Sequence, residues 1–191
     1  MIRVREARPD DADALAAAHV EGWRVGYRGV VPADYLDDPA FAASRLARWQ
    51  AWTWGDDLPG AQVFVAEIGE RVVGFGFCGP ARVNPTCDQI SSPTGGATST
   101  ELGEVYAFYL HPDAWGSGAA AALMARCHEF LRDNGFERAV LWVLRDNPRA
   151  RAFYEKSGWS PTGRESQFTG PQTAGGPLPW ALTEVEYARQ G

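Results

Sequence analysis

A run of small, uncharged residues in the middle of the chain has the composition of a phosphate-binding loop. Residues 111–123 read HPDAWGSGAAAAL, so Gly116 and Gly118 stand directly before an alanine-rich segment. If that segment is a helix, its first N–H groups lack partners inside the helix and carry partial positive charge. Glycine lets an anion approach such a backbone because no Cβ stands in the way. A tight loop without a ligand is the alternative interpretation.

The same run lacks the usual nucleotide-binding patterns. It has no GxxxxGK followed by Ser or Thr, and therefore no lysine and hydroxyl arranged for a triphosphate and Mg²⁺. GxGxxG is also incomplete, since Ala119, Ala120 and Ala121 follow Gly118. The missing lysine counts against an ATP or NAD site on this loop.

Composition limits the partners and the compartment that we expect. The 191 residues are 45% hydrophobic and 12% aromatic, which is a globular composition. A formal net charge of −6 argues against nucleic acid bound through a general basic surface. The three cysteines include no CxxC pair and the three histidines no HExxH, so we expect a reducing cytoplasm and no metal site.

Membrane attachment is not expected either. No apolar run approaches the ~20 residues that a membrane span needs. The N-terminus MIRVREARPDD shows no apolar signal-peptide segment. We therefore expect no membrane partner.

Hydrophobic periodicity predicts the elements that position the loop. The expected strands lie at 2–7, at 61–79 as a hairpin around Gly69-Glu70, and at 103–111, 138–145 and 181–189. The expected helices begin at Pro9, cover about 39–52, run from the loop to Asn134, and cover 147–158. Residues 24–38 are expected to form a loop rich in aromatics and glycine. Residues 80–102 have no period and are expected to form a mobile loop, and 160–179 is a polar, Gly/Pro-rich connection.

This order of elements, β-α-α-β-β-β-α-β-α-β, predicts the fold class. Hairpins come first, and one β-α-β crossover lies at 103–145, which makes one pair of strands parallel. We expect an α/β (α+β) fold with a mixed, largely antiparallel central sheet flanked by helices. No linker interrupts the sequence, so 1–191 is predicted to be a single domain.

The stretch 104–159 resembles the core of the GCN5-related N-acetyltransferase (GNAT) family. The resemblance is carried by a strand ending in LHP, the glycine loop, a helix, a second strand, Asn147 and ARAFYEKSGW at 150–159. The hairpin at 62–78 and an opening R.A...D fit as well, so most of the chain is covered. The resemblance implies the GNAT fold and transfer of an acetyl group from acetyl-CoA, without a metal.

In that family a loop of pattern Q/R-x-x-G-x-G/A holds the pyrophosphate of coenzyme A with its backbone amides. Gly118 and Ala120 match this pattern, whereas Trp115 replaces the usual Gln or Arg without removing a backbone donor. Asn147 resembles the residue that binds the pantetheine arm, and it is also a candidate helix N-cap. The cofactor-binding residues implied by the resemblance are Tyr109, Leu110, Trp115, Gly116, Ser117, Gly118, Ala119, Ala120, Asn147 and Tyr154.

Two residues are the catalytic candidates that the resemblance implies. Tyr154 stands seven residues after Asn147, and a phenol with a pKa of ~10 can donate a proton to a departing thiolate. Its alternative role is to pack with Phe153 as an aromatic pair. Glu104 is the candidate base that takes the amine proton, with Glu101 or a water as alternatives; it is otherwise an ordinary strand carboxylate.

The acceptor is described only by class. The resemblance implies that the N-terminal aromatic region lines the acceptor pocket. Trp23 and Tyr27 are predicted to bind the substrate. We expect direct transfer in a ternary complex to a primary amine, with a small molecule favoured over a protein N-terminus or lysine. A homodimer is compatible with the family. The rival interpretation is a non-catalytic acyl-CoA-binding module on the same fold.

Overall fold

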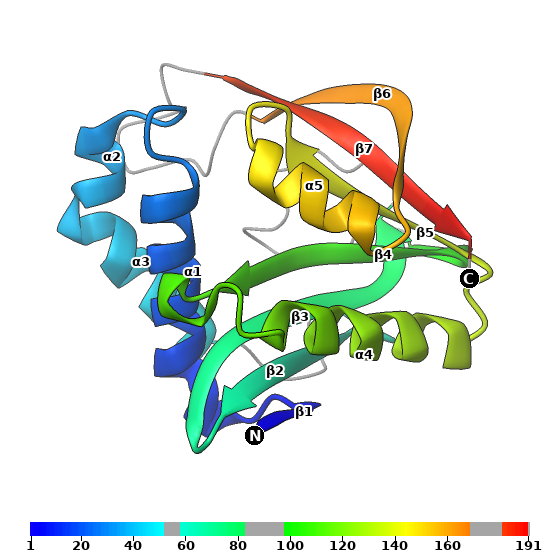
Figure 1. The fold of residues 1–191 in the computed structure, drawn as a ribbon, viewed down its shortest axis with the longest axis horizontal. Helices are drawn as coiled ribbons and strands as arrows, with labels where there is room; N and C mark the ends of the chain where they lie inside the picture. The colour runs from blue at the N-terminus through cyan, green and yellow to red at the C-terminus, as the bar shows by residue number, and fades with distance from the viewer. Residues whose placement is uncertain (52–57, 83–97, 169–180, 191) are drawn as a thin grey trace. The chain divides into compact units, whose positions relative to one another are not determined.

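The structure, a computed structural model, describes residues 1–51, 58–82, 98–168 and 181–190 (Figure 1). The chain forms two compact units, each built from separate stretches of sequence. The first unit comprises Met1–Asp56, Gln62–Phe77 and Ala107–Glu129, and the second comprises Asp57–Ala61, Cys78–Tyr106 and Phe130–Gly191. The prediction of a single domain stays a prediction.

The strands form a seven-stranded sheet in the order β1-β2-β3-β4-β5-β7-β6. In chain order they are β1 (Ile2–Glu6), β2 (Gln62–Ile68), β3 (Arg71–Arg82), β4 (Thr98–Leu110), β5 (Arg138–Leu144), β6 (Ser160–Phe168) and β7 (Leu182–Gln190). β1 pairs antiparallel with β2, and β7 pairs antiparallel with both β5 and β6. β4 and β5 are parallel because a helix crosses between them. The predicted mixed, largely antiparallel sheet is confirmed.

Five α-helices lie within the described residues. They are α1 (Ala12–Gly26), α2 (Ala33–Asp37), α3 (Pro39–Gln50), α4 (Ala119–Asp133) and α5 (Pro148–Lys156). α3 and α5 each begin with a proline that follows a capping residue, Asp38 or Asn147, whose side chain accepts a backbone N–H of the first turn. The Pro9 start predicted for the first helix is a 3-10 turn, Pro9–Asp11, that leads into α1.

An ion network in the first unit ties the start of α1 to the first two strands. The Arg5 guanidinium donates to both carboxylate oxygens of Asp11, at 2.7 and 2.8 Å, and to Glu67 at 2.7 Å. The Arg8 N–H also donates to Asp11. Burial acts to raise the pKa of Asp11, but these hydrogen bonds outweigh it and lower that pKa. The Asp11 charge therefore stabilises the folded state.

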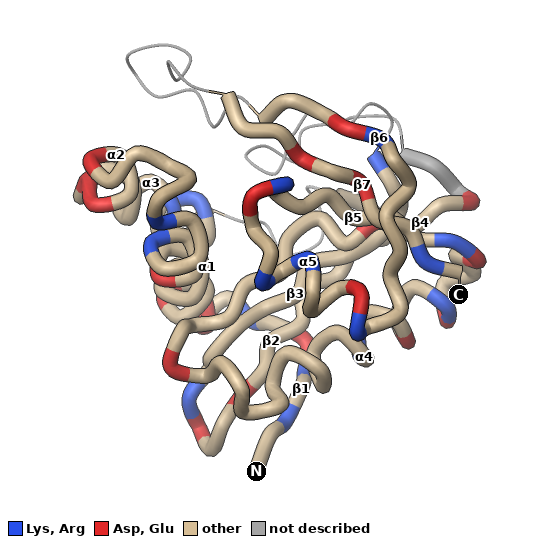
Figure 2. The backbone as a smooth tube through the Cα atoms, turned by 45° about the horizontal axis from the view of Figure 1, so that its top comes forward, with Lys and Arg blue, Asp and Glu red and all other residues tan. Residues whose placement is uncertain are grey.

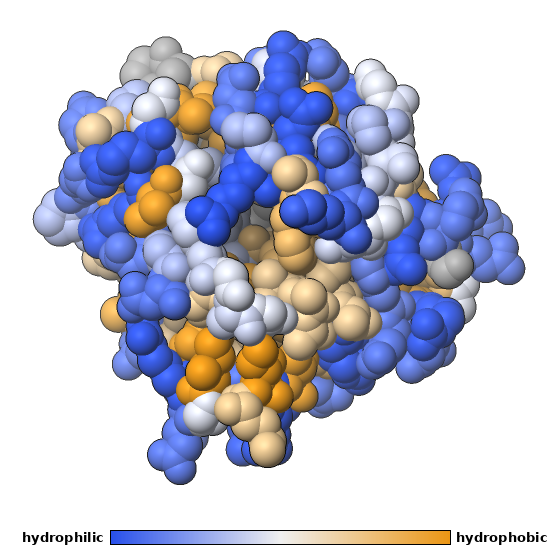
Figure 3. Space-filling model, in the orientation of Figure 1, coloured by the Kyte–Doolittle hydropathy of each residue, from blue (hydrophilic) through white to orange (hydrophobic). Residues whose placement is uncertain are grey.

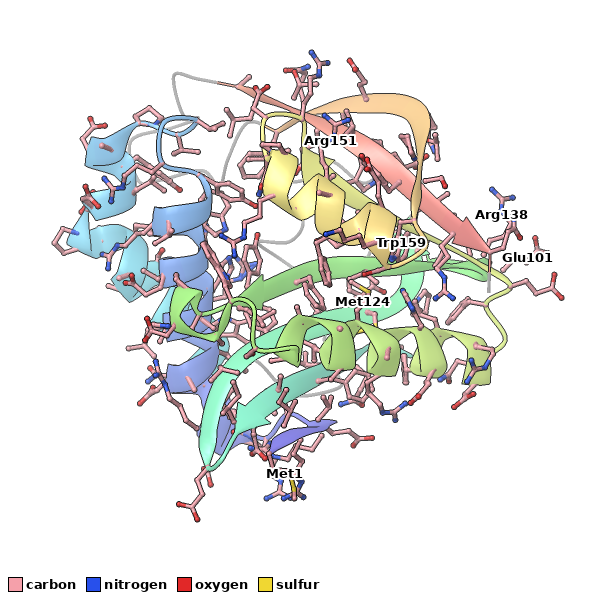
Figure 4. All side chains as sticks on the ribbon, in the orientation of Figure 1. Met1, Glu101, Met124, Arg138, Arg151 and Trp159 are labelled. Carbon is pink, nitrogen blue, oxygen red and sulfur yellow. The ribbon has the colours of Figure 1, made fainter. Side chains whose placement is uncertain are left out.

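The second unit is organised around Tyr187, a fully buried residue of β7. Its hydroxyl accepts a hydrogen bond from Arg151 at 3.1 Å and donates one to Glu155 at 2.9 Å. Arg151 and Glu155 lie one helical turn apart on α5, so both bonds hold that helix against the strand. Figure 4 shows Arg151 on α5 and Trp159 just after it. These contacts determine where α5 presents its other residues.

Three parts of the predicted element order were wrong. Residues 160–168 form β6 and not a polar connection, because an exposed edge strand carries no hydrophobic alternation. The predicted loop 80–102 is shorter, since 80–82 close β3 and 98–102 open β4; the mobility expected for 83–97 lies outside the described residues. The region 24–38, expected to be a loop, contains the end of α1 and the short helix α2.

The glycine at position 74 is predicted to be essential for stability. A Cβ there would lie 2.6 Å from the Tyr109 carbonyl oxygen and 2.6 Å from Leu110 Cγ. The carbonyl oxygen belongs to the backbone, so relieving this overlap would require the strand itself to shift. Gly74→Ala should lower the free energy of unfolding by about 1–3 kcal/mol, measured by urea denaturation. Gly26→Ala is the control, because no heavy atom lies within 4 Å of its Cβ. Equal stability of the two variants would contradict the packing described.

The Asp11 network predicts a pH dependence of stability. Because the folded-state pKa of Asp11 is lowered, its contribution is present above the unfolded value of about 3.9 and is lost as the pH falls through the folded value. Asp11→Asn should cost about 1.5–3 kcal/mol at neutral pH. The difference from wild type should shrink in acid, and Asp10→Asn, at an exposed neighbouring position, should show no such convergence. A constant difference across the pH range would refute this account.

Candidate active site

The loop before α4 has the conformation that its glycines predict. Gly116 and Gly118 have φ values of +79° and +92°, in the left-handed region that favours glycine. The Ser117 hydroxyl donates to the Ala114 carbonyl at 2.6 Å and accepts the Ala119 N–H at 3.2 Å. The loop is therefore held in place by its own serine while its two glycines remain exposed.

The first turn of α4 offers backbone donors to a ligand. The Ala119 N–H is bonded to Ser117, and the Ala122 N–H donates to the Gly118 carbonyl at 3.1 Å. Within the described residues, this leaves the N–H groups of Ala120 and Ala121 available at the positive end of the helix. Residues 115–124 carry no charge, as the tan tube of Figure 2 shows. This arrangement fits a phosphate group.

Trp115, the departure from the family pattern, braces the loop. Its indole N–H donates to the Leu110 carbonyl at 3.3 Å and so links the loop to the end of β4. On the face drawn in Figure 3, apolar side chains gather low in the view, where Figure 1 places the start of α4 and β2. Gln or Arg at position 115 would place a polar side chain here, whereas the Trp115 indole connects the loop to β4 by a hydrogen bond.

Tyr109 and Leu110, whose backbone is predicted to bind pantetheine, are packed between two glycines. Gly22 of α1 faces Tyr109, with its ideal Cβ position 3.3 Å from the ring, and Gly74 of β3 faces both residues. The His111 N–H donates to the Val73 carbonyl at 2.7 Å, where β4 ends. α1 and β3 thus approach the last residues of β4 closely.

The predicted acceptor residues join Tyr109 in an aromatic cluster of the first unit. Trp23 is buried, and its indole N–H donates to the Tyr109 hydroxyl at 3.0 Å. Tyr27 packs edge-on against Trp23, with ring centroids 4.8 Å apart. His19 stacks on Tyr109 at 4.5 Å, and burial, reinforced by the charges of Arg45 and Arg48, holds its pKa well below the ordinary value. His19 is therefore neutral at physiological pH.

Arg45 belongs to this cluster, and the sequence reasoning missed it. Its side chain is 4% exposed, and its guanidinium lies 5.7 Å from the Trp23 ring centroid and 4.9 Å from that of Phe41. Phe41, Arg45 and Trp49 stand four residues apart on α3, and all three are buried. An arginine between two aromatics on the apolar stripe of a helix was the signal that would have found it.

In the second unit, α5 carries the predicted acid and the predicted pantetheine residue. Asn147 accepts the Ala150 N–H at 3.0 Å and caps the helix, as the alternative interpretation expected. Tyr154 is buried, and its ring lies near those of Phe153 and Tyr187, at 5.6 and 6.5 Å. The aromatic pair with Phe153 therefore exists, and it does not exclude a role for the hydroxyl.

Glu104, the predicted base, forms a buried ion pair with Arg82. The carboxylate is 1% exposed and accepts hydrogen bonds from the Arg82 backbone N–H at 3.0 Å and from its guanidinium. Burial and the Glu104 charge together raise the pKa of Tyr106. Glu101 is exposed and points outward in Figure 4. Both carboxylate oxygens of Glu104 accept hydrogen bonds from Arg82, and the choice among Glu104, Glu101 and water stays open.

The predicted site residues thus fall into two groups. The first unit brings together Trp23, Tyr27, Tyr109, Leu110, Trp115 and the loop 116–120, whereas Glu104, Asn147 and Tyr154 belong to the second. Across the described ranges, no three His, Cys, Asp or Glu side chains are grouped so as to hold a metal ion. None of the helices described is both long and apolar enough to cross a membrane.

The sequence of the chain matches a known protein family. Residues 28–159 match the acetyltransferase (GNAT) family. The chain is 34% identical over 148 residues to the uncharacterized N-acetyltransferase YuaI of Bacillus subtilis, a match that covers 78% of this chain and 75% of that protein. The chain therefore belongs to the GNAT acetyltransferase family.

Solved structures of acetyltransferases are similar to this fold. The PaiA N-acetyltransferase of Thermoplasma acidophilum, solved in complex with coenzyme A, superposes with a TM-score of 0.70 at 14% identity and covers 100% of this chain and 99% of that one. YncA of Salmonella typhimurium, solved with its cofactor acetyl-CoA, has a TM-score of 0.62 at 20% identity, with 99% and 93% covered. At these identities the likeness shows the fold.

The loop geometry predicts a charge effect at position 118. Gly118→Asp should place a carboxylate against the α4 donors and abolish coenzyme A binding, measured by calorimetry. Gly118→Asn is the matched control, because it has nearly the same size, the same positive φ and no charge. Asn should retain most of the affinity. Unchanged affinity in a folded Asp variant would remove the loop from the cofactor site.

Proposed function

We propose that the protein is an acetyl-CoA-dependent N-acetyltransferase that moves the acetyl group to a primary amine by direct transfer in a ternary complex. A small-molecule amine is favoured over a protein N-terminus or lysine. The start of α4 carries this proposal, because two exposed glycines with positive φ precede a helix whose first donors point to no charged side chain of the loop. Membership in the GNAT family supports the reaction type.

The residues of the chain fit coenzyme A as follows. The amides of the loop 115–120 would hold the pyrophosphate, and the backbone of Tyr109 and Leu110 would pair with the pantetheine amides like an added strand. The Asn147 oxygen caps α5, which leaves the Nδ2 of the same side chain as a donor to the pantetheine arm. When bound, acetyl-CoA supplies the acetyl group as an activated thioester.

The proton transfers are assigned to two protein groups. Glu104, Glu101 or a water accepts the proton of the attacking amine. Tyr154 donates from its phenol to the departing sulfur, a role that a positioned acid can fill with about 10²–10⁴-fold effect on rate. Holding amine and donor together accounts for a further ~7–11 kcal/mol of barrier lowering. The free thiols Cys78 and Cys127 suit a reducing compartment, and we assign the enzyme to the cytoplasm.

The experiment that tests this function is release of coenzyme A thiol from acetyl-CoA with pools of primary amines, with product masses read from the same wells. Amine-dependent thiol and a product heavier by one acetyl group would establish the reaction. Thiol without an acetylated amine would mean hydrolysis only. Coenzyme A binding without thiol release from any pool would favour the non-catalytic acyl-CoA-binding module.

Tyr154→Phe is predicted to lower kcat by about 100-fold while leaving KM for acetyl-CoA unchanged. The substitution removes the hydroxyl but keeps the ring that packs near Phe153 and Tyr187. Steady-state kinetics on the amine identified by the pools provides the measurement.

Tyr187→Phe is the control for this prediction, because it removes a neighbouring hydroxyl that holds α5 through Arg151 and Glu155. It should lower the melting temperature and change kcat far less than Tyr154→Phe. If both variants lost kcat equally, the effect at 154 would come from a loosened α5 and the assignment of Tyr154 as the acid would fail.

A further inference from the structure

Arg45 is a buried cation with an Nε–H that no acceptor in the described part of the chain engages. The residue is 4% exposed, and its Nε is buried without a hydrogen-bond partner there. Its contacts are cation–π contacts, with the Trp23 and Phe41 rings. An aromatic ring face attracts the positive charge of a guanidinium. It does not accept hydrogen bonds from the N–H groups, which point outward in the plane of the guanidinium.

Three described acidic side chains of the first unit have partners other than Arg45. Burial lowers the pKa of Arg45, and the groups that oppose this effect are the phenols of Tyr35 and Tyr109, with no carboxylate among them. Glu21 pairs with Arg24, Asp37 pairs with Arg28, and Asp38 caps α3. A desolvated cation without an acceptor is unfavourable, so the site as described is suited to an anion from outside the chain.

A second cation strengthens the preference for an anion. Arg48 follows Arg45 by one turn of α3, and burial together with the Arg45 charge lowers the pKa of Arg48 to about 10. A bound anion would relieve this repulsion. The planar fork of Arg45 matches a carboxylate with two parallel hydrogen bonds. The surrounding rings of Trp23, Phe41 and Tyr35 suit an organic body that carries a single negative charge.

We propose that Arg45 binds the carboxylate of the acceptor, so that the acceptor is an amino acid: a primary amine that also carries a carboxylate. This inference rests on the proposed acetyl transfer and adds its substrate class. The link to the reaction is Trp23, which lies under the Arg45 guanidinium and donates to the hydroxyl of Tyr109, a residue of the proposed pantetheine strand. Arg45 acts in binding and has no part in proton transfer.

The test compares amino acids with the amines that result when their carboxylate is removed. L-phenylalanine is paired with phenethylamine and L-leucine with isoamylamine, and kcat and KM are measured for each. The wild type should prefer the amino acid of a pair. Arg45→Met should raise KM for the amino acid by about 10–100-fold, the loss expected for hydrogen bonds to a charged group. KM for the corresponding amine should stay the same. Arg3→Met, at an exposed arginine of β1, should change neither.

Two further measurements separate a binding role from a structural one. Replacing an unpartnered buried cation by an apolar side chain should leave the melting temperature of the unliganded protein equal or higher. Arg45→Lys keeps the charge but loses the fork, so its KM for the amino acid should fall between wild type and Arg45→Met. A lower melting temperature for Arg45→Met, with equal losses for amino acid and amine, would show a structural role and overturn the proposal.

A binding measurement without turnover distinguishes failure of this inference from failure of the proposed function. Calorimetry on the coenzyme A-loaded protein with the same probes should show that amino acids bind more tightly than the corresponding amines. In Arg45→Met the two affinities should become equal. This result without acetylation would keep the carboxylate site and refute the transferase. Acetylation of amines with no preference for amino acids would keep the transferase and refute the site. An Arg45-dependent preference for succinyl-CoA over acetyl-CoA, in place of any acceptor effect, would also refute it.

Discussion

Tyr109 and Leu110 lie between two glycines, and the arrangement of the first unit around the end of β4 depends on that close packing. Gly22 of α1 and Gly74 of β3 present no side chain, so a helix and a strand both approach the end of β4. Close-packed interiors transmit such constraints, because neighbouring atoms have no free volume in which to move. The glycine loop starts from this anchored strand end, and Trp115 ties it back to Leu110. The Tyr109 ring in turn orients Trp23 through its hydroxyl.

Buried charge is treated in two different ways in this protein. In the Arg5–Asp11 and Arg82–Glu104 pairs a carboxylate accepts the hydrogen bonds of the guanidinium, and removing one partner would leave the other charge unpaired. Arg45 has aromatic neighbours and an Nε without a partner in the described chain. The contrast separates arginines that are paired within the chain from Arg45, which we propose binds a ligand. Glu104, which the sequence predicts to be a base, accepts hydrogen bonds from Arg82 in the folded protein.

Much of the fold followed from local patterns. The hairpin turn at Gly69, the proline starts of α3 and α5, and the crossover between β4 and β5 each depend on residues close together in sequence. The conformation of the loop before α4 was predictable for the same reason, since positive φ favours glycine wherever it occurs. The role of Asn147 as a cap also rests on a bond to Ala150, three residues away. Family resemblance added roles for Tyr154 and Glu104 that these patterns do not contain.

The sequence by itself determined the class of fold and the glycine conformation of the loop before α4, because both arise from short-range geometry and hydrophobic periodicity. Tertiary structure alone decided which buried charges are paired. The Arg82–Glu104 pair joins residues 22 positions apart, and β6 exists because β7 offers it an edge. The sequence places Arg45 on the apolar stripe of α3, but only the tertiary structure brings its guanidinium to the Trp23 ring. Burial without a partner depends on what the rest of the chain brings near, and no local pattern records that.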